Sequence, residues 1–379
     1  MNNIFKLSDD GKIFIKVLDK TAEHITRPYG VEVIEEGAFR QCSSLQSVNI
    51  PNSVTTIREG AFESCEALQS IDIPDSVTTI EREAFIFCSA MLSVNIPNSV
   101  KTIGDMAFAR CEALQSIDIP TSVEDIGKNA FDGCEELQGI NVASENQFFT
   151  SIGGVLYSKD LTKLVKVPAE AILKTFSIPD NVTTIARGAF MDCSSLQSID
   201  IPASVVEIGW YEFAHCTKLQ SINVAEGNQH YTSIDGVLYN KMLTTLIRVP
   251  QGAEFEEFSI PDSVTTIEGR ALSDCSSLQS VYIPEGVTTI EMEAFEGCSS
   301  LQSIDIPASV EHIGTAAFSS CDALQSVHMH STDVEERYST YGVFDNEETG
   351  ELTLYVPAGT IDAYRDRPMF SWFCNIEEE

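Results

Sequence analysis

Cysteine is the reactive residue with the most regular spacing in this sequence. Ten of the eleven cysteines follow one another at intervals of 23 or 59 residues, and only Cys374 lies outside the series. Thiolates bind zinc or pair as disulfides, whereas neutral thiols pack as small apolar groups. The members of the series are Cys42, Cys65, Cys88, Cys111, Cys134, Cys193, Cys216, Cys275, Cys298 and Cys321.

Three interpretations of this series are open. A zinc site needs Cys or His ligands at short spacings such as Cys-x-x-Cys, and the sequence contains no such pair. Disulfides between neighbouring repeats are sterically allowed if the repeats stack closely. A column of reduced thiols beside phenylalanine fits the pattern best, because free cysteine behaves as a small hydrophobic side chain.

The second set of chemically capable residues lies near residue 330. His328 and His330 alternate around Met329, so both rings are expected on one face of a strand. Asp305 and Tyr282 precede His328 by one and two repeat lengths and should lie in the same outward column. A weak site for a metal or for an acidic ligand is one hypothesis, and polar residues that mark the last full repeat are the other.

Catalytic motifs are missing from the sequence. We find no GxSxG, HExxH, GxGxxG or GxxxxGK[ST] string, so the chain lacks the usual signatures of hydrolases, zinc proteases, dinucleotide enzymes and P-loop proteins. Carboxylates such as Asp72, Asp118 and Asp200 recur once per repeat, unlike the single carboxylate pair of a glycosidase. We therefore expect no enzymatic activity and no cofactor.

A repeat of 23 residues must position all of these side chains. The stretch LQSIDI at 68–73 predicts a short strand with Leu68, Ile71 and Ile73 pointing inward. Pro74 ends this strand, and a second extended piece follows.

The remainder of the repeat completes the apolar face. Val77 and Ile80 point inward from the second extended piece, and Ala84 and Cys88 then share one face of about two helical turns, with Phe85 beside them. One repeat cannot bury this face alone, so the repeats must stack. The predicted fold is an α/β repeat solenoid, a right-handed superhelix with a parallel β-sheet on one face and short helices or turns on the other.

The repeat resembles a known family. The pattern IPxSVTxIxxxAFxxCxxLxSIxIP, over residues 31–330, is similar to the BspA-like leucine-rich repeat of bacterial surface antigens and adhesins. The segments NQHYTSIDGVLY and LYVPAGTIDAYRDRPMFSWFCNI also resemble parts of that family. The resemblance implies a leucine-rich-repeat solenoid, export, and adhesion to host proteins or to other cells.

Three regions are expected along the chain. Residues 1–30 alternate around Asp9-Asp10-Gly11 and predict an N-terminal β-hairpin cap. Residues 31–330 form the solenoid of ten 23-residue repeats, interrupted by hairpin inserts at 143–178 and 225–260 that begin 82 residues apart. Residues 331–379 break the period and predict a C-terminal cap rich in aromatic residues: Tyr338, Tyr341, Phe344, Tyr364, Phe370, Trp372 and Phe373.

Charge restricts the partners. With 57 acidic and 23 basic residues, the formal net charge is −34, which disfavours nucleic acid and anionic membranes. No apolar run is long enough to insert into a membrane. The first ten residues do not form a secretory signal, so the protein is cytoplasmic if the chain is complete and exported if a signal was trimmed. The oligomeric state is left open.

Binding is the predicted function. The strand face should present a column of glutamines and a column of Asn and Asp, represented by Gln69, Asp72, Gln115 and Asp118. Departures from the pattern are further candidates: Tyr282, Asp305, His328 and His330 on the strand face, and Trp210 and Tyr211 on the convex side. We expect a protein partner, from a host or another bacterial protein. Surface adhesion is the first hypothesis, a cytoplasmic interaction scaffold is the second, and an enzyme or small-molecule protein is the third.

Overall fold

The computed structural model describes residues 4–25, 30–171, 174–209, 211–334, 342–344, 352–370 and 373–379. They form two compact units. The first contains Met1–Leu173, Asn181–Ser195 and Glu207–His215, and the second contains Lys174–Asp180, Leu196–Val206 and Cys216–Glu379.

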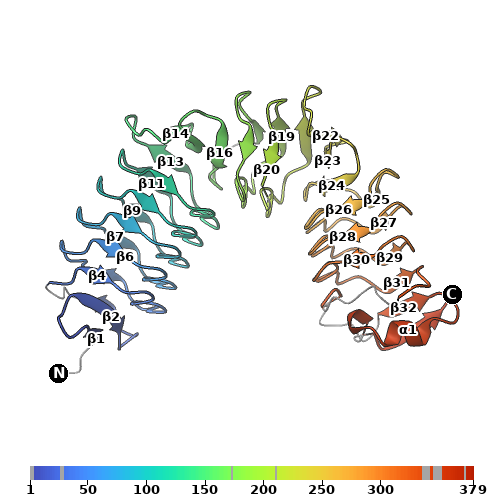
Figure 1. Cartoon of the computed structure of the whole chain (residues 1–379), viewed down its shortest axis with the longest axis horizontal. Helices are drawn as coiled ribbons and strands as arrows, with labels where there is room; N and C mark the ends of the chain where they lie inside the picture. Colours follow the sequence, from blue (N-terminus) through green and yellow to red (C-terminus); the bar gives the residue numbers. More distant parts are fainter. Residues whose placement is uncertain are drawn as a thin grey trace. The chain divides into compact units, whose positions relative to one another are not determined.

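In the first unit, each repeat contributes one strand to each of two parallel stacks (Figure 1). The strands of the stack that we call the strand face are β3 (His24–Ile25), β5 (Ser47–Val48), β7 (Ser70–Asp72), β9 (Ser93–Asn95), β11 (Ser116–Ile119) and β13 (Gly139–Val142). The second stack, which we call the second sheet, contains the consecutively paired strands β4 (Val33–Ile34), β6 (Thr56–Ile57), β8 (Thr79–Ile80), β10 (Thr102–Ile103) and β12 (Asp125–Ile126). Beyond the first insert, β18 (Thr184–Ile185) and β20 (Glu207–Ile208) pair with each other in a separate sheet that continues this stack.

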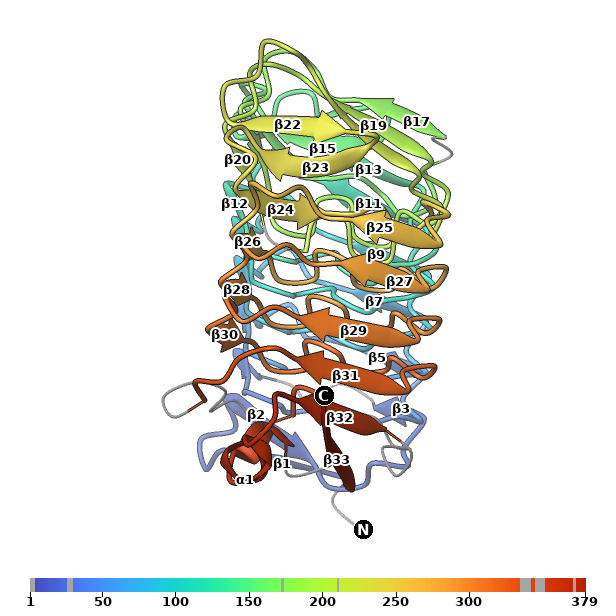
Figure 2. The ribbon, with the colours of Figure 1, turned by 90° about the vertical axis from the view of Figure 1, so that its right-hand side faces the viewer.

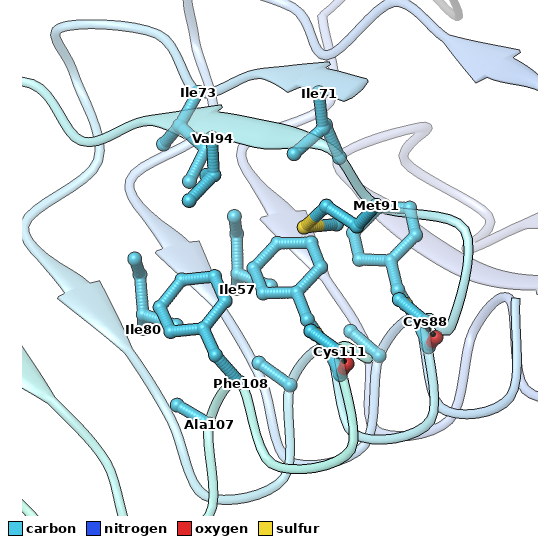
Figure 3. Packing of buried hydrophobic residues seen from close by; sticks show 14 of the residues in the cluster. Ile57, Ile71, Ile73, Ile80, Cys88, Met91, Val94, Ala107, Phe108 and Cys111 are labelled. Carbon is cyan, nitrogen blue, oxygen red and sulfur yellow. Dashed lines mark hydrogen bonds between the residues drawn. The ribbon is translucent and has the colours of Figure 1, made fainter. Parts of the chain in front are cut away.

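The inward residues predicted from the sequence are buried. Leu68, Ile71 and Ile73 face the core from the strand face, and Val77 and Ile80 face it from the second sheet. Figure 3 shows side chains of both sheets meeting phenylalanine and cysteine between them. The repeat solenoid of stacked parallel strands is therefore confirmed.

Of the short helices or turns predicted opposite the strand face, the structure has turns, and the prediction of about two helical turns is wrong. Residues 58–65 form successive tight turns, because Gly60 and Ser64 have φ of +57° and an α-helix cannot continue through left-handed residues. The residue before each column cysteine likewise has φ between +55° and +71°. The N–H groups of residues 61, 63 and 65 donate to carbonyls three residues earlier, while those of 60, 62 and 64 donate to the next repeat. We call this third hydrogen-bonded stack the turn ladder.

The buried side chains of the turn ladder stack from repeat to repeat. Phe39, Phe62, Phe85 and Phe108 lie nearly parallel, with adjacent ring centroids 4.5 to 5.2 Å apart. Phe14 extends this column by stacking on Phe39 at 4.6 Å. It belongs to an antiparallel pair formed by β1 (Phe5–Leu7) and β2 (Ile13–Val17), and β2 then pairs in parallel with β4. The hairpin therefore covers the first apolar layer of the repeats.

The first insert adds three strands to the first unit. β14 (Phe149–Ile152), β15 (Val155–Ser158) and β16 (Lys163–Lys166) form an antiparallel meander, and β16 pairs in parallel with β18. The fully buried Asn146 anchors the meander: its amide donates to the carbonyls of Pro120 and Val123 at 2.8 and 2.9 Å. Its carbonyl oxygen accepts the N–H groups of residues 148 and 149, each at 2.8 Å.

The second unit repeats this construction (Figure 2). Its strand face contains β17 (Thr175–Ser177), β19 (Ser198–Ile201), β21 (Ser221–Val224), β25 (Glu257–Ser259), β27 (Ser280–Tyr282), β29 (Ser303–Ile306), β31 (Ser326–Met329), β32 (Thr353–Val356) and β33 (Asn375–Glu378). The second insert supplies β22 (Tyr231–Ile234), β23 (Val237–Asn240) and β24 (Thr245–Arg248), and the second sheet continues through β26 (Thr266–Ile267), β28 (Thr289–Ile290) and β30 (His312–Ile313).

The end of the chain closes the core of the second unit with aromatic side chains. Phe344 stacks on Phe318 at 5.2 Å, and the Tyr364 hydroxyl donates to the Ser331 carbonyl at 2.7 Å. Tyr364 lies in the short helix α1 (Ile361–Arg365), which precedes the 3-10 turn η2 (Pro368–Phe370). Tyr338, Tyr341 and Trp372 lie outside the described residues. The division into two caps and a solenoid stays a prediction, as does the handedness of the superhelix.

Candidate binding surface

The strand face of the first unit presents polar side chains in register. Gln69, Asp72, Gln115 and Asp118 are all exposed. Asp72 lies opposite Asn95 across the β7–β9 pair, so an amide follows the carboxylate along the column. The sequence predicted this uniform polar surface, and the structure shows which of its residues lie opposite one another on neighbouring strands.

Asp and Asn alternate from strand to strand in this column, so neighbouring carboxylates do not lie directly opposite one another and repel. Asp118 lies opposite Asn141, whose amide donates to the Asp118 carboxylate at 2.9 Å. In the second unit, Asn223 donates to Asp200 at 3.0 Å in the same way. Like charges directly opposite one another destabilise a strand pair, so the amides both separate and stabilise the carboxylates. The result is a pre-ordered array of hydrogen-bonding groups.

The candidates near residue 330 form one network in the second unit. Asp305 lies directly opposite His328 across the β29–β31 pair. His330 Nε2 is 3.2 Å from the Asp305 carboxylate, and His328 Nδ1 is 2.8 Å from the Glu379 carboxylate. A second Glu379 oxygen lies 3.9 Å from His330 Nδ1. Both rings therefore contact carboxylates on the outward side of the sheet.

Two members of this network were missed in the sequence, namely Tyr355 and Glu379. Tyr355 lies opposite His328 in the β31–β32 pair, and the two rings stack with centroids 4.6 Å apart. A signal for Tyr355 was present, because Thr353-Leu354-Tyr355-Val356-Pro357 follows the same pattern as Ser303-Ile304-Asp305-Ile306-Pro307. No sequence signal places Glu379 beside the histidines, because its position depends on the path of the chain after α1.

The remaining aromatic candidates lie in different places. Tyr282 is 54% exposed on β27 and lies opposite Ser259 of β25. Tyr211 lies in the turn ladder of the first unit, away from the strand face, and the Arg187 guanidinium carbon is 5.1 Å from its ring centroid. Trp210 lies outside the described residues. Tyr211 and Tyr282 therefore belong to separate surfaces.

The cysteine column is a core feature. All eleven cysteines lie within the described residues and carry thiols, and ten of them are buried. The Cys65, Cys88 and Cys111 thiols each donate to the phenylalanine carbonyl 26 residues earlier, at 3.2 to 3.3 Å. Burial raises the pKa of Cys88, Cys134 and Cys193 to about 12, which keeps these groups protonated near neutral pH.

Within the described ranges, no three or more His, Cys, Asp or Glu side chains are arranged to hold a metal ion. The histidine network is instead linked by hydrogen bonds and ring stacking. Among the same residues, no helix has the length and apolar character needed to cross a bilayer.

Comparison with known proteins places the repeat in a family. Six copies of the BspA type leucine rich repeat region match residues 18–155, 169–252 and 250–354. A search of curated proteins gave no match.

Solved structures share the fold. The pneumococcal vaccine antigen PcpA aligns with a TM-score of 0.56 and 21% identity, over 99% of this chain and 82% of that one. A leucine rich cell surface protein from Faecalibacterium prausnitzii aligns with a TM-score of 0.53 and 26% identity, over 99% and 92%. A leucine-rich repeat protein from Eubacterium ventriosum aligns with a TM-score of 0.53 and 23% identity, over 83% and 91%. With family matches over most of its length, the chain belongs to the BspA-type leucine-rich repeat family.

Proposed function

We propose that this protein is a non-enzymatic binding protein of the bacterial cell surface, which recognises a host extracellular protein or another bacterial protein through its strand face. The observation that carries the proposal is the hydrogen-bonded, outward-facing array of side chains on parallel strands, of which Asp118 and Asn141 are one pair. Such an array offers a partner many contacts at fixed spacing, which favours multivalent recognition.

The C-terminal part of the second unit's strand face is the proposed centre of recognition. It holds the exposed Tyr282, and Tyr355 stacked on His328. Tyrosine is enriched among residues that dominate binding energy, whereas the glutamine and Asn/Asp columns contain few such residues. We therefore expect the columns to orient a partner and the tyrosines to supply most of the affinity.

The surface location rests on a relative and on family membership. The Faecalibacterium relative, 26% identical over nearly the whole chain, is described as a cell surface protein. A cytoplasmic interaction scaffold is the second candidate, and the observation that favours it is the ten buried thiols, which suit a reducing compartment.

Protease treatment of intact native cells tests the location. Loss of the full-length band from unbroken cells, with a cytoplasmic marker protected, is the result expected of a surface protein. Protection of the band until lysis would overturn the surface proposal and favour the scaffold.

A binding screen tests the function itself. The purified chain is screened against extracellular proteins, and the affinity of any partner found is compared for Tyr282→Ala, Tyr355→Ala and the control Gln147→Ala, an exposed residue of the first insert outside the strand-face columns. We expect at least a tenfold loss for a tyrosine variant, about 1.4 kcal/mol or more, and little change for the control. Equal affinities in all three variants would remove the strand-face tyrosines from the proposal.

A further inference from the structure

The first insert leaves a gap in the turn ladder of the first unit. In regular repeats the residue before the cysteine donates its N–H to the next repeat, as Arg110 does to the Asp132 carbonyl at 2.7 Å. Gly133 occupies the same position beside the insert, but its N–H donates at 3.0 Å to the carboxylate of Asp192, 59 residues further along the chain. A side chain from the next regular repeat thus replaces the missing main-chain partner.

The path of the insert explains the gap. Val167 occupies the position that phenylalanine has in a regular repeat. Like that phenylalanine, it donates its N–H to the alanine carbonyl of the next repeat, Ala189, at 2.8 Å, and its carbonyl accepts from the column thiol of Cys193 at 3.8 Å. Pro168 then follows, and Glu170 donates its N–H back to the Leu137 carbonyl at 2.9 Å. The chain therefore turns aside before it can complete a turn-ladder segment.

A cavity of about 430 Å³ lies at this gap, and we call it the notch. This volume is within the range of roughly 300–1,000 Å³ found for ligand pockets. Both flanking repeats and the insert line it, and all of the lining residues belong to the first unit: Arg110, Glu135, Glu136, Glu170, Asp192, Ser194 and His215.

The notch has an excess of negative charge. Four carboxylates line it, those of Glu135, Glu136, Glu170 and Asp192, against the one guanidinium of Arg110. The buried Asp132 of the repeat that carries Glu135 does not add to this excess, because its Oδ1 accepts from the Lys166 ammonium at 2.9 Å. Carboxylates gathered around a cavity raise the local concentration of cations.

The second insert shows that the fold does not require this charge. At the positions 82 residues after Glu136 and Glu170 it has Lys218 and Gly252. Gln251 stands where the first insert has Ala169, and its amide donates to the Asp274 carboxylate at 2.8 Å. The duplicated block thus has Lys218 where the first has the carboxylate of Glu136, Gly252 where the first has that of Glu170, and a glutamine bridge where the first has alanine.

We propose that the notch is a second binding site of this protein, which takes the guanidinium or ammonium group of an arginine or lysine side chain on the partner protein. This inference rests on the proposed protein-binding function and adds a contact away from the strand face. A single cationic side chain suits the notch because carboxylates approach it from several sides and accept hydrogen bonds from its donors. The negative charge disfavours phosphate and carboxylate ligands.

Titration of the full chain with a blocked peptide of alternating glycine and arginine tests the proposal. The control peptide carries citrulline, which keeps the shape of arginine without its charge. Salt near 150 mM suppresses general attraction to a chain of charge −34. We expect binding of the arginine peptide and at least a tenfold weaker response with the citrulline peptide.

Matched charge reversals locate the site. Glu135→Lys changes the notch, and Glu66→Lys changes the equivalent residue after Cys65, three repeats away. Both side chains are exposed, and thermal unfolding checks that both variants fold. We expect Glu135→Lys to weaken arginine-peptide binding about tenfold and Glu66→Lys to leave it nearly unchanged.

Several results would overturn the inference. These are equal losses in the two variants, equal binding of both peptides, no binding, or binding of free diamines or calcium without binding of the peptide. The strand-face proposal is judged separately by partner capture with Tyr282→Ala. If the arginine peptide does not bind but Tyr282→Ala loses affinity for the captured partner, the notch proposal fails and the strand-face proposal stands.

Discussion

The amide of Asn146 donates to the carbonyl of Val123, 23 residues earlier, at 2.9 Å, and Asn228 repeats this bond to Val205 at the same distance. Each asparagine is fully buried and makes four hydrogen bonds, two from its amide and two to its carbonyl oxygen. We expect Asn146→Ala to destabilise the first insert by about 2–3 kcal/mol, because main-chain groups lose partners in the core.

Hydrogen exchange of the β14–β15 amides measures this effect locally, because each repeat of such a protein contacts mainly its neighbours and can open as a separate unit. Gln147→Ala, at an exposed neighbour, is the control. Unchanged exchange in Asn146→Ala would show that the insert does not depend on this anchor.

The phenylalanine column should be sensitive to lost volume. Phe85 is fully buried between Phe62 and Phe108, at centroid distances of 5.1 and 5.2 Å. Phe85→Ala should cost about 3–5 kcal/mol, because it removes apolar contacts and leaves a cavity. Phe85→Leu should cost much less, since Leu272 already occupies the equivalent position in another repeat. Chemical denaturation with exchange of the neighbouring amides checks both values, and equal losses would contradict this packing argument.

The thiol column predicts alkaline instability. Burial raises the pKa of Cys88, Cys134, Cys193, Cys275 and Cys321 to about 12, against about 8.5 for an unfolded cysteine. Above the lower value the unfolded chain has lost protons that the folded chain retains. Stability is therefore fully present below about pH 8.5 and falls towards pH 12, by about 1.4 kcal/mol per pH unit for each such thiol.

Denaturation at a series of alkaline pH values tests this dependence. Cys88→Ala should reduce the slope of the free energy of unfolding against pH by the contribution of one thiol. Cys374→Ala, at the exposed cysteine, should leave that slope unchanged. A flat profile between pH 8.5 and 11 would contradict the burial of the column.

A charged pair lies in the core of the first unit. Lys166 donates to Asp132 at 2.9 Å and to the Gly188 carbonyl at 2.9 Å. Burial by itself lowers the pKa of Lys166, but attraction to Asp132 and other nearby groups outweighs it, and the pKa is raised overall. Lys166→Met should cost about 3–5 kcal/mol, because Asp132 would remain buried without its cation.

The double variant Lys166→Met with Asp132→Leu provides the control for this pair. It should recover most of the lost stability, because no isolated charge remains. Thermal unfolding measures both variants. A double variant less stable than Lys166→Met would show that the pair contributes more than charge neutralisation.

The apolar periodicity predicted the stacking of parallel strands because burial fixes which residues face inward. Leu68, Ile71 and Ile80 followed that rule. The rule could not exclude helical turns at 81–88. Ala84 and Cys88 follow Ile80 by four and eight residues, and this spacing suits a helix as well as successive turns. The deciding feature is the positive φ at Glu83 and Phe87, neither of which is glycine. A signal was present in other repeats, because glycine with positive φ occupies the position of Glu83 at Gly37, Gly60 and Gly188 and that of Phe87 at Gly133 and Gly297.

The candidate surface was predictable where it follows the repeat and unpredictable where it depends on the chain's path between repeats. Asp305 and His328 were assigned to one column from their spacing, and they lie opposite one another. Glu379 and the notch arise where the chain leaves the regular path, after α1 and after Pro168. The packing of such segments is set by tertiary contacts that a single sequence does not display.

The two inserts begin 82 residues apart at equivalent points, Ala143 and Ala225, each preceded by the strand sequence Ile-Asn-Val. Removal of residues 143–224 would join Val142 to Ala225 and keep every inward and outward position in phase. The gene can therefore change the reach of this protein in whole blocks, by unequal recombination, without designing a new junction or a new core. The number of repeats can therefore change while the sequences at the two ends of the chain stay the same.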